Sequence, residues 1–274
     1  MNRRFDKYYR TRRLPHIWCP GCGNGIILNG MMEAFDRLKI DQDKTVIVSG
    51  IGCSSRAPLY MNFDTLHTTH GRAIAFATGV KMNRPDLNVI VITGDGDAAS
   101  IGGNHLIHAA RRNIDLTVIC FNNFTYGMTN GQYSPTTTRL SRSATSPYGS
   151  LERPFDLCKL LIGAGASYVA RGTTYHVRML PALIVNAINN KGFSFVEILT
   201  QCPTYFGRAN KMGSPSAMLR WLKDNSVRQE ETEAMQEEER SRKFVLGEFV
   251  NRPGLEYSAE YEKLIAAVRV KEGK

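Results

Sequence analysis

Two short polar motifs, each following an apolar run, are the residues best suited to chemistry. Gly-Asp-Gly-Asp at residues 94–97 follows the apolar run 89–93, and Asn-Asn at residues 122–123 follows the apolar run 116–121. Glycines beside a carboxylate let the backbone turn tightly toward a phosphate, and carboxylate and amide oxygens are ligands that Mg²⁺ takes together with phosphate oxygens. Gly-Asp-Gly alone often just ends a strand, but the two motifs together predict a site for a magnesium-bound diphosphate.

Four cysteines form a second candidate site. Cys19 and Cys22 belong to a Cys-Pro-Gly-Cys loop, whose spacing lets two thiolates bind one metal centre, while Cys53 and Cys202 lie far along the chain. Four thiolates can hold a [4Fe-4S] cluster or a single zinc ion. One pair with two single cysteines differs from the two pairs of a zinc ribbon, but these residues by themselves leave both the cluster and zinc open.

The apolar pattern predicts the elements that must position these groups. Strands that alternate with helices are typical of an α/β fold with a mostly parallel sheet and helices on both faces. Pro181 lies near the middle of the last predicted helix of the sheet region and predicts a kink there. The segment 123–154 is longer than the usual connection between two elements of a compact domain, which predicts a functional loop. The predicted helices are 25–38, 71–81, 101–112, 155–163 and 175–190, and the predicted strands are 45–48, 89–93, 116–121 and 195–199.

Cys53, Asp95, Asn123 and Cys202 each follow one of the predicted strands. In an open parallel sheet the carboxyl ends of the strands lie along one edge, where ligands collect in a crevice. We therefore expect these four residues, which are far apart in the sequence, to converge at one edge of the sheet.

The whole chain has 274 residues and a formal net charge of +10, enough length for one large α/β domain. We expect a basic N-terminal arm at 1–16, a ligand-binding domain at 17–206 and a C-terminal helical extension at 207–274, with 195–199 as the last strand. The chain shows neither a continuous apolar run of membrane-span length nor an apolar signal core, and its cysteines are too dispersed for a disulfide framework. These features predict a cytoplasmic protein with Cys120 and Cys158 in its core. Nucleic-acid binding is the weakest interpretation of the charge, because no known binding module accompanies it.

The motifs, in this order, resemble the β subunit of a 2-oxoacid:ferredoxin oxidoreductase, most closely the 2-oxoglutarate type, over roughly three quarters of the chain. The resemblance rests on Trp-Cys-Pro-Gly-Cys-Gly at 18–23, Gly-Cys-Ser-Ser-Arg at 52–56, Thr-His-Gly-Arg at 69–72, the blocks at 94 and 122, Gly-Gln-Tyr-Ser-Pro-Thr-Thr at 131–137 and Gln-Cys-Pro-Thr at 201–204.

The resemblance implies a thiamine diphosphate-binding fold with Mg²⁺ and a [4Fe-4S] cluster. Magnesium would take the carboxylate of Asp95, the side-chain oxygen of Asn123 and the carbonyl of Thr125. His70 is expected to meet the cofactor, and Arg56 to pair either with the distal carboxylate of 2-oxoglutarate or with a protein or cofactor anion. The implied cluster ligands are Cys19, Cys22, Cys53 and Cys202, and the implied cofactor contacts are Ile51, Gly52, Cys53, Ser54, His70, Gly96, Asp97, Gly127 and Met128.

For activity the resemblance implies oxidative decarboxylation of a 2-oxoacid with coenzyme A to acyl-CoA and CO2, with electrons passing through the cluster to ferredoxin, a sequence that some members reverse. It also implies an α subunit that carries the pyrimidine-binding domain, in an (αβ)2 assembly. The basic arm is then either solvated, covered by a partner, or a docking site for an acidic ferredoxin. Two alternatives stay open: pyruvate or a branched-chain 2-oxoacid as substrate, and a non-redox thiamine-dependent decarboxylase subunit with a structural zinc.

Overall fold

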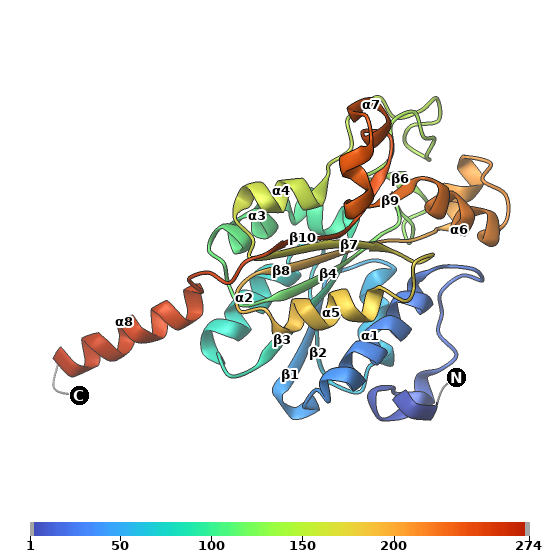
Figure 1. The fold of residues 1–274 in the computed structure, drawn as a ribbon. Helices are drawn as coiled ribbons and strands as arrows, with labels where there is room; N and C mark the ends of the chain where they lie inside the picture. Colours follow the sequence, from blue (N-terminus) through green and yellow to red (C-terminus); the bar gives the residue numbers. More distant parts are fainter. Residues whose placement is uncertain (1–2, 272–274) are drawn as a thin grey trace.

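An eight-stranded sheet runs through the molecule in the order β2-β1-β3-β4-β8-β7-β10-β9 (Figure 1). The computed structural model describes residues 3–271; residues 1–2 and 272–274, at the ends of the expected basic arm and C-terminal extension, and the side chains of Arg3 and Arg4 lie outside the described part. From β2 to β7 all neighbouring strands are parallel. These strands are β1 (Thr45–Ser49), β2 (Asp64–His67), β3 (Asn88–Gly94), β4 (Thr117–Asn122), β7 (Tyr168–Thr173) and β8 (Ser194–Leu199).

Helices cover both faces of the sheet, as the alternation predicted (Figure 1). Successive side chains of a strand point to opposite faces, and in β3 Ile90 and Ile92 belong to one core while Val89 and Val91 belong to the other. The first core contains α1 (Asn24–Leu38) and α5 (Leu180–Asn189), and the second contains α2 (Ala73–Asn83), α3 (Gly103–Arg111) and α4 (Leu157–Ala164). Cys120 and Cys158 are buried in the second core, as expected.

The five predicted helices are all present, but one internal feature is wrong. Pro181 does not kink the middle of a helix, because α5 begins at Leu180 and Pro181 lies in its first turn. The missing N–H of proline has no helical partner to lose at that position, and its fixed φ suits a helix start. A second difference concerns the helix predicted at 101–112. A short π-helical segment, η5 (Asp97–Ile101), precedes α3, so helical structure starts soon after the end of β3.

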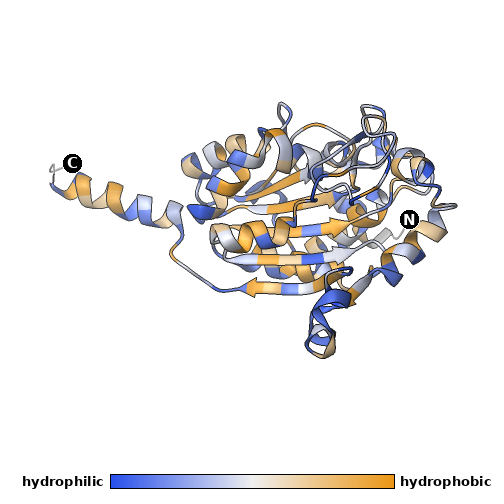
Figure 2. Cartoon of the chain, turned by 90° about the horizontal axis from the view of Figure 1, so that it is seen from above, coloured by the Kyte–Doolittle hydropathy of each residue, from blue (hydrophilic) through white to orange (hydrophobic). Residues whose placement is uncertain are grey.

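The C-terminal region contains helices but is not wholly helical, so residues 195–199 are not the last strand. Between α6 (Pro215–Asp224) and α8 (Tyr257–Lys271) the chain forms β9 (Ser226–Arg228), η7 (Gln229–Ala234), α7 (Glu237–Arg240) and β10 (Phe244–Asn251). β10 pairs antiparallel with β7, a strand that the sequence did not predict either. The edge of β7 offers unpaired backbone groups, and β10 satisfies them while burying Leu246 and Val250. Figure 2 shows α8 standing away from the body.

The N-terminal segment is anchored to the domain. It forms η1 (Arg3–Tyr8) and η2 (Thr11–Arg13). Tyr8 is buried, stacks on Phe63 and donates a hydrogen bond from its hydroxyl to the carbonyl oxygen of Phe35 at 3.1 Å. Across residues 3–271, no helix is both long and apolar enough to cross a membrane.

Candidate active site

The carboxyl ends of β1, β3 and β4 surround a cavity of about 390 Å³, at the sheet edge where the sequence placed the site. Asp95, Asn123 and Thr125 line it, together with all nine residues expected to contact the cofactor. Four further lining residues were not singled out from the sequence: Asn24, Tyr126, Thr129 and Phe121. Asn24 is the most notable of these, because it is 1% exposed and its amide nitrogen and oxygen both lack a hydrogen-bond partner. The sequence signal for it was a polar residue at the start of an amphipathic helix, directly before the apolar residues of its first turns.

Asp95 is a buried carboxylate on the cavity wall. It is 2% exposed, and its Oδ2 accepts a hydrogen bond from Thr136 Oγ1 at 2.7 Å. Burial raises the pKa of Asp95 to about 6, although hydrogen bonds from Ser134 and Thr136 act in the opposite direction. A buried carboxylate is costly unless a positive charge accompanies it. With the side-chain oxygen of Asn123 and the backbone of Thr125 in the same wall, the donor set suits Mg²⁺.

Two glycines shape the cavity wall: Gly52 leaves it open to a diphosphate, and Gly96 makes room for the ring of Tyr126. Gly52 has a φ of +125°, and no atom lies within 4 Å of the place a Cβ would occupy. At Gly96 a Cβ would lie 2.4 Å from the ring of Tyr126, so no other residue fits without a shift. Backbone can approach a ligand closely only where such side chains are absent. The wall therefore fits the phosphate end of thiamine diphosphate as well as its metal.

Asp97 lines the cavity, and its carboxylate also accepts several hydrogen bonds from the protein. The residue is 3% exposed, and its carboxylate is occupied by the protein. Its Oδ1 accepts hydrogen bonds from the backbone N–H of Gly71 at 2.7 Å and of Ile51 at 3.3 Å, and its Oδ2 accepts one from Thr93 Oγ1 at 2.8 Å. The side chain thus ties together the loops that follow β1, β2 and β3.

His70 is held by the same carboxylate. Its Nδ1 lies 2.6 Å from Asp97 Oδ1. Because the carboxylate is an acceptor, Nδ1 carries the proton and Nε2 is left as the free ring nitrogen of a residue that lines the cavity. The structure therefore places His70 where a cofactor contact is expected, and it adds Asp97 as the group that orients the ring.

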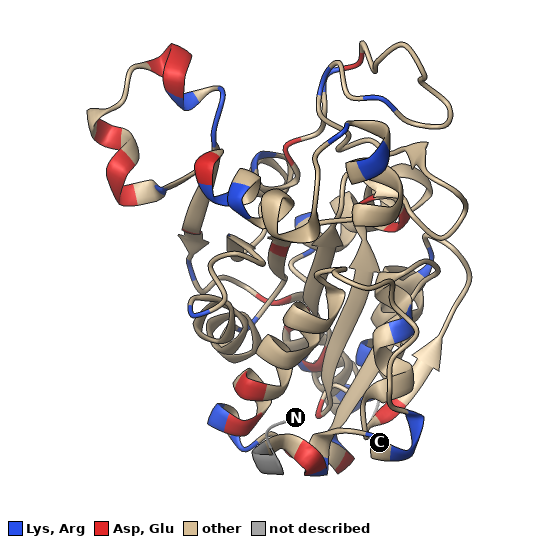
Figure 3. Ribbon diagram, turned by 90° about the vertical axis from the view of Figure 1, so that its right-hand side faces the viewer, with Lys and Arg blue, Asp and Glu red and all other residues tan. Residues whose placement is uncertain are grey.

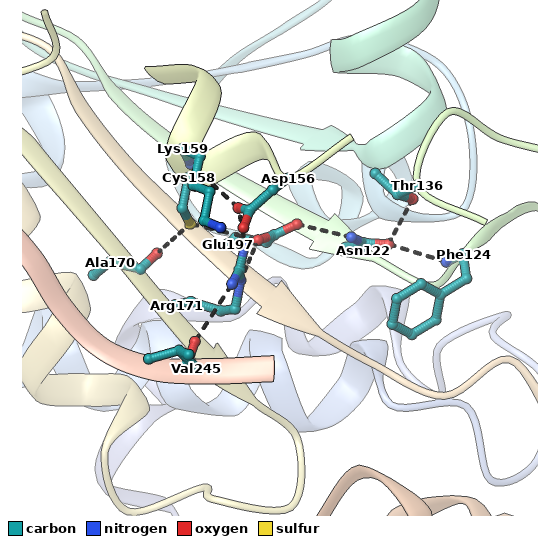
Figure 4. A network of polar contacts seen from close by, with 10 residues as sticks. All are labelled: Asn122, Phe124, Thr136, Asp156, Cys158, Lys159, Ala170, Arg171, Glu197 and Val245. Atoms are coloured by element: carbon teal, nitrogen blue, oxygen red, sulfur yellow. Dashed lines mark hydrogen bonds and ion pairs between the residues drawn. The ribbon is translucent and has the colours of Figure 1, made fainter. Parts of the chain in front are cut away.

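Thr136, which holds Asp95, also begins a buried polar network that crosses the sheet (Figure 4). Thr136 Oγ1 lies 3.0 Å from Asn122 Oδ1, and Asn122 Nδ2 donates to Glu197 Oε1 at 2.8 Å. Glu197 Oε2 accepts from Arg171 Nε at 2.6 Å, and Arg171 also pairs with Asp156. These residues were not found from the sequence, because a lone Arg in β7 and a lone Glu in β8 carry no motif.

The four cysteines come together beside the cavity. A Cβ on Gly127 would lie 3.4 Å from the sulfur of Cys53 and 3.7 Å from that of Cys202, so these two thiols approach the same point. Burial, and next the neighbouring thiols of the set, raise the pKa of Cys22 to about 12 and the pKa of Cys53 to about 11. Cys19 is exposed.

The thiols are spread more widely than ligands of one ion. Within the described residues, no three His, Cys, Asp or Glu side chains are close enough to hold a single metal ion. A cubane cluster places one thiolate on each of its irons, so its ligands need not meet at one point. The four thiols, two from the 19–22 loop and two that lie near Gly127, form a donor set that fits such a cluster.

Arg56 lies just outside the cavity. Its Nη2 is 3.9 Å from the sulfur of Met128, a residue of the cavity wall. Arg56 is half-buried, and its guanidinium has no ion-pair partner among residues 5–271. It is therefore free to meet an anion near the cavity mouth.

Comparison with known proteins gives relatives along the whole chain. Residues 50–198 match the family model described as thiamine pyrophosphate enzyme, C-terminal TPP binding domain. The chain is 55% identical over 268 residues to the 2-oxoglutarate synthase subunit KorB of Methanothermobacter thermautotrophicus, covering 98% of this chain and 93% of that one. It is 46% identical over 190 residues to the 2-oxoacid:ferredoxin oxidoreductase subunit beta of a Sulfolobus species, covering 69% and 62%.

A solved structure is similar as well. The 2-oxoglutarate:ferredoxin oxidoreductase from Magnetococcus marinus, solved with 2-oxoglutarate, coenzyme A and succinyl-CoA bound, superposes with a TM-score of 0.84 at 34% identity. The match covers 98% of this chain and 90% of that chain.

Proposed function

Because the chain belongs to the family of 2-oxoglutarate synthase and 2-oxoacid:ferredoxin oxidoreductase β subunits, we propose that it serves in the oxidative decarboxylation of 2-oxoglutarate. In that reaction the 2-oxoacid releases CO2, its acyl group passes to coenzyme A, and one proton and two electrons are set free. The observation that supports the proposal most is the single cavity in which Asp95, Asn123, Thr125 and His70 meet beside the cysteine set.

Thiamine diphosphate, when bound, supplies the carbon nucleophile and the electron sink for this chemistry. In this chain Asp95, Asn123 and the carbonyl of Thr125 would hold its magnesium ion. Gly52 would let the backbone approach the diphosphate. His70, oriented by Asp97, would accept a hydrogen bond at Nε2 on the cofactor side of the cavity.

A [4Fe-4S] cluster on Cys19, Cys22, Cys53 and Cys202, when bound, supplies a relay for single electrons. The raised pKa values of Cys22 and Cys53 mean that the cluster-free thiols keep their protons at neutral pH. Cluster binding would displace those protons, because iron binds thiolates. Cys53 lines the cavity and also belongs to the cysteine set, so one loop would connect the two centres.

The site needs a partner chain. Thiamine diphosphate needs a carboxylate beside its aminopyrimidine. The two carboxylates that line the cavity are unsuited to this role, because Asp95 would bind the magnesium ion and Asp97 accepts hydrogen bonds from the protein. An α subunit with the pyrimidine-binding domain would supply it, in an (αβ)2 assembly. Arg56 would pair with the distal carboxylate of 2-oxoglutarate, and ferredoxin would receive the electrons.

The proposal is tested on the co-purified αβ complex with thiamine diphosphate, Mg²⁺ and coenzyme A. 2-Oxoglutarate is expected to give faster reduction of an acceptor than pyruvate or branched-chain 2-oxoacids, and R56Q is expected to narrow that preference. Preference of the wild type for pyruvate would refute the substrate. A colourless, zinc-loaded protein after anaerobic purification would refute the redox function and support the decarboxylase alternative.

A further inference from the structure

The loop that carries Cys19 is the place where the cysteine set reaches the surface. Cys19, Pro20 and Gly21 are exposed, whereas Cys53 is half-buried and Cys202 is buried. Electrons that reach the cysteine set therefore have their shortest path to another protein through this loop. Proline and glycine beside the thiol leave little side-chain bulk between it and an approaching surface.

The loop is held in place from the protein side. Trp18 is 7% exposed and donates from Nε1 to the carbonyl oxygen of Cys53 at 2.7 Å. Gln201 Nε2 donates to the carbonyl oxygen of Gly21 at 3.1 Å. Gly21 has a φ of +77° and packs against Pro215, which a Cβ would meet at 2.3 Å. The loop thus presents a fixed surface to a partner.

Exposed cations lie on the segments that flank this loop. One group, in η2, precedes the loop, and the other follows η6 (Pro203–Gly207), which begins directly after Cys202. The backbone of Arg142 joins the second group, since its N–H donates to Asn210 Oδ1 at 2.8 Å and its carbonyl accepts from Asn210 Nδ2 at 3.0 Å. The exposed cations are Arg12, Arg13, Arg142, Arg208 and Lys211. None of them has an ion-pair partner in the part of the chain from residue 5 to residue 271.

The surface around the loop also contains an exposed apolar residue, and most of the acidic residues of the C-terminal region lie elsewhere. Ile17, two residues before Cys19, is 67% exposed. Small electron-transfer interfaces have this composition, with an apolar centre and a polar rim that steers the partner. The glutamates of residues 229–242 gather instead on a lobe that projects from the body (Figure 3).

We propose that this surface, formed by the 17–21 loop and its five flanking cations, docks a small acidic one-electron carrier protein of the ferredoxin class. At each docking event the reduced cluster loses one electron and the carrier gains it, without a bond being made or broken. The inference rests on the proposed function and adds to it the place of docking and the charge of the partner.

The test uses the holo αβ complex and a purified acidic ferredoxin. Two charge-reversal pairs, R12E/R13E and R208E/K211E, are compared with the control pair R269E/K271E, which carries the same change of charge on α8. Each docking pair is expected to raise the KM for ferredoxin about tenfold and to flatten its dependence on ionic strength, while the control pair stays near the wild type. The rate at which 2-oxoglutarate and coenzyme A bleach the cluster absorbance should be unchanged in all variants, because that step needs no carrier.

Cluster bleaching tests the proposed function, and the KM for ferredoxin tests the docking surface. If the wild type fails to bleach, the proposed function is wrong. If the wild type bleaches but the KM of both docking pairs equals that of the control, the docking surface is wrong. If cluster bleaching is lost in a charge-reversed variant, the neutral pairs R12Q/R13Q and R208Q/K211Q are measured instead. These pairs are expected to raise the KM for ferredoxin by an intermediate factor. An unchanged KM would contradict the inference.

Discussion

At the scale of single residues, two aspartates one residue apart have different environments. Asp95 shares the cavity wall with other oxygen donors, whereas Asp97 accepts hydrogen bonds from two loops and from Thr93 in β3. The motif predicted that both residues lie at the site, and they do. It did not predict that Gly71 and Ile51 donate to Asp97, because their loops are far from Asp97 in the sequence.

Replacing Asp97 by Asn should disturb both the cofactor cavity and His70. The amide keeps the size but offers one acceptor oxygen where the carboxylate offers two, which leaves buried donors unpaired at about 1–3 kcal/mol each. We expect D97N to bind thiamine diphosphate with Mg²⁺ about tenfold more weakly or worse and to melt at a lower temperature. Titration calorimetry measures the first effect, with D86N, at an exposed ion pair, as control. Wild-type affinity in D97N would contradict the positioning role.

Thr136 gives a second residue prediction. Its hydroxyl holds Asp95 Oδ2, and groups that hold metal ligands typically contribute 10–100-fold to metal affinity. T136V should therefore raise the Mg²⁺ concentration needed for half-maximal thiamine diphosphate binding about tenfold. T117V is the matched control, since Thr117 is also a buried threonine but its hydroxyl bonds to Ala187. Equal magnesium requirements in the two variants would show that Thr136 has no such role.

At the scale of elements, the central strands were predictable and the outer ones were not. β3 and β4 are apolar runs between amphipathic helices, the usual pattern of strands buried on both faces. β7 contains Arg171, and β10 contains Gly247 and Glu248, so neither has a continuous apolar run. Their identity as strands depends on pairing with neighbouring strands, β7 with β8 and β10 and β10 with β7 and β9, which local sequence does not reveal.

The pairing predicts how truncation affects stability. A chain ending at residue 256 loses α8, of which only Ser258 is buried, and should keep its melting temperature within a few degrees. A chain ending at residue 243 also loses β10, exposes the edge of β7 and should unfold far more readily or aggregate. Circular dichroism melts of both proteins provide the measurement. Similar melting temperatures for the two truncations would contradict the role of β10.

The ion pair between β7 and the start of α4 predicts a dependence on pH. Burial alone would raise the pKa of Asp156, but Arg171 outweighs it and the pKa is lowered. The charged form therefore stabilises the fold above the ordinary carboxyl pKa, and this contribution is lost as the pH falls toward the folded value. The difference in unfolding free energy between wild type and D156N should be full at neutral pH and shrink in acid. A difference independent of pH would rule out the ion pair as its cause.

At the scale of the whole molecule, the sheet edge joins two centres that the sequence places far apart. The cavity of Asp95 and Asn123 and the thiols of Cys53 and Cys202 lie side by side because four parallel strands end along one edge. This convergence could be predicted, since it follows from the parallel order of the strands. The exposure of the Cys19 loop and the unpaired cations near it could not, because burial and ion pairing depend on the finished fold.

Reduction of a bound cluster by 2-oxoglutarate would show that the cavity and the cysteine set work together. The αβ complex is purified anaerobically, loaded with thiamine diphosphate and Mg²⁺, and mixed with 2-oxoglutarate and coenzyme A while its visible absorbance is followed. The account predicts a brown protein whose cluster absorbance bleaches with 2-oxoglutarate and does not bleach when Asp95 is replaced by Asn. A protein without iron, or a cluster that 2-oxoglutarate leaves oxidised, would contradict it.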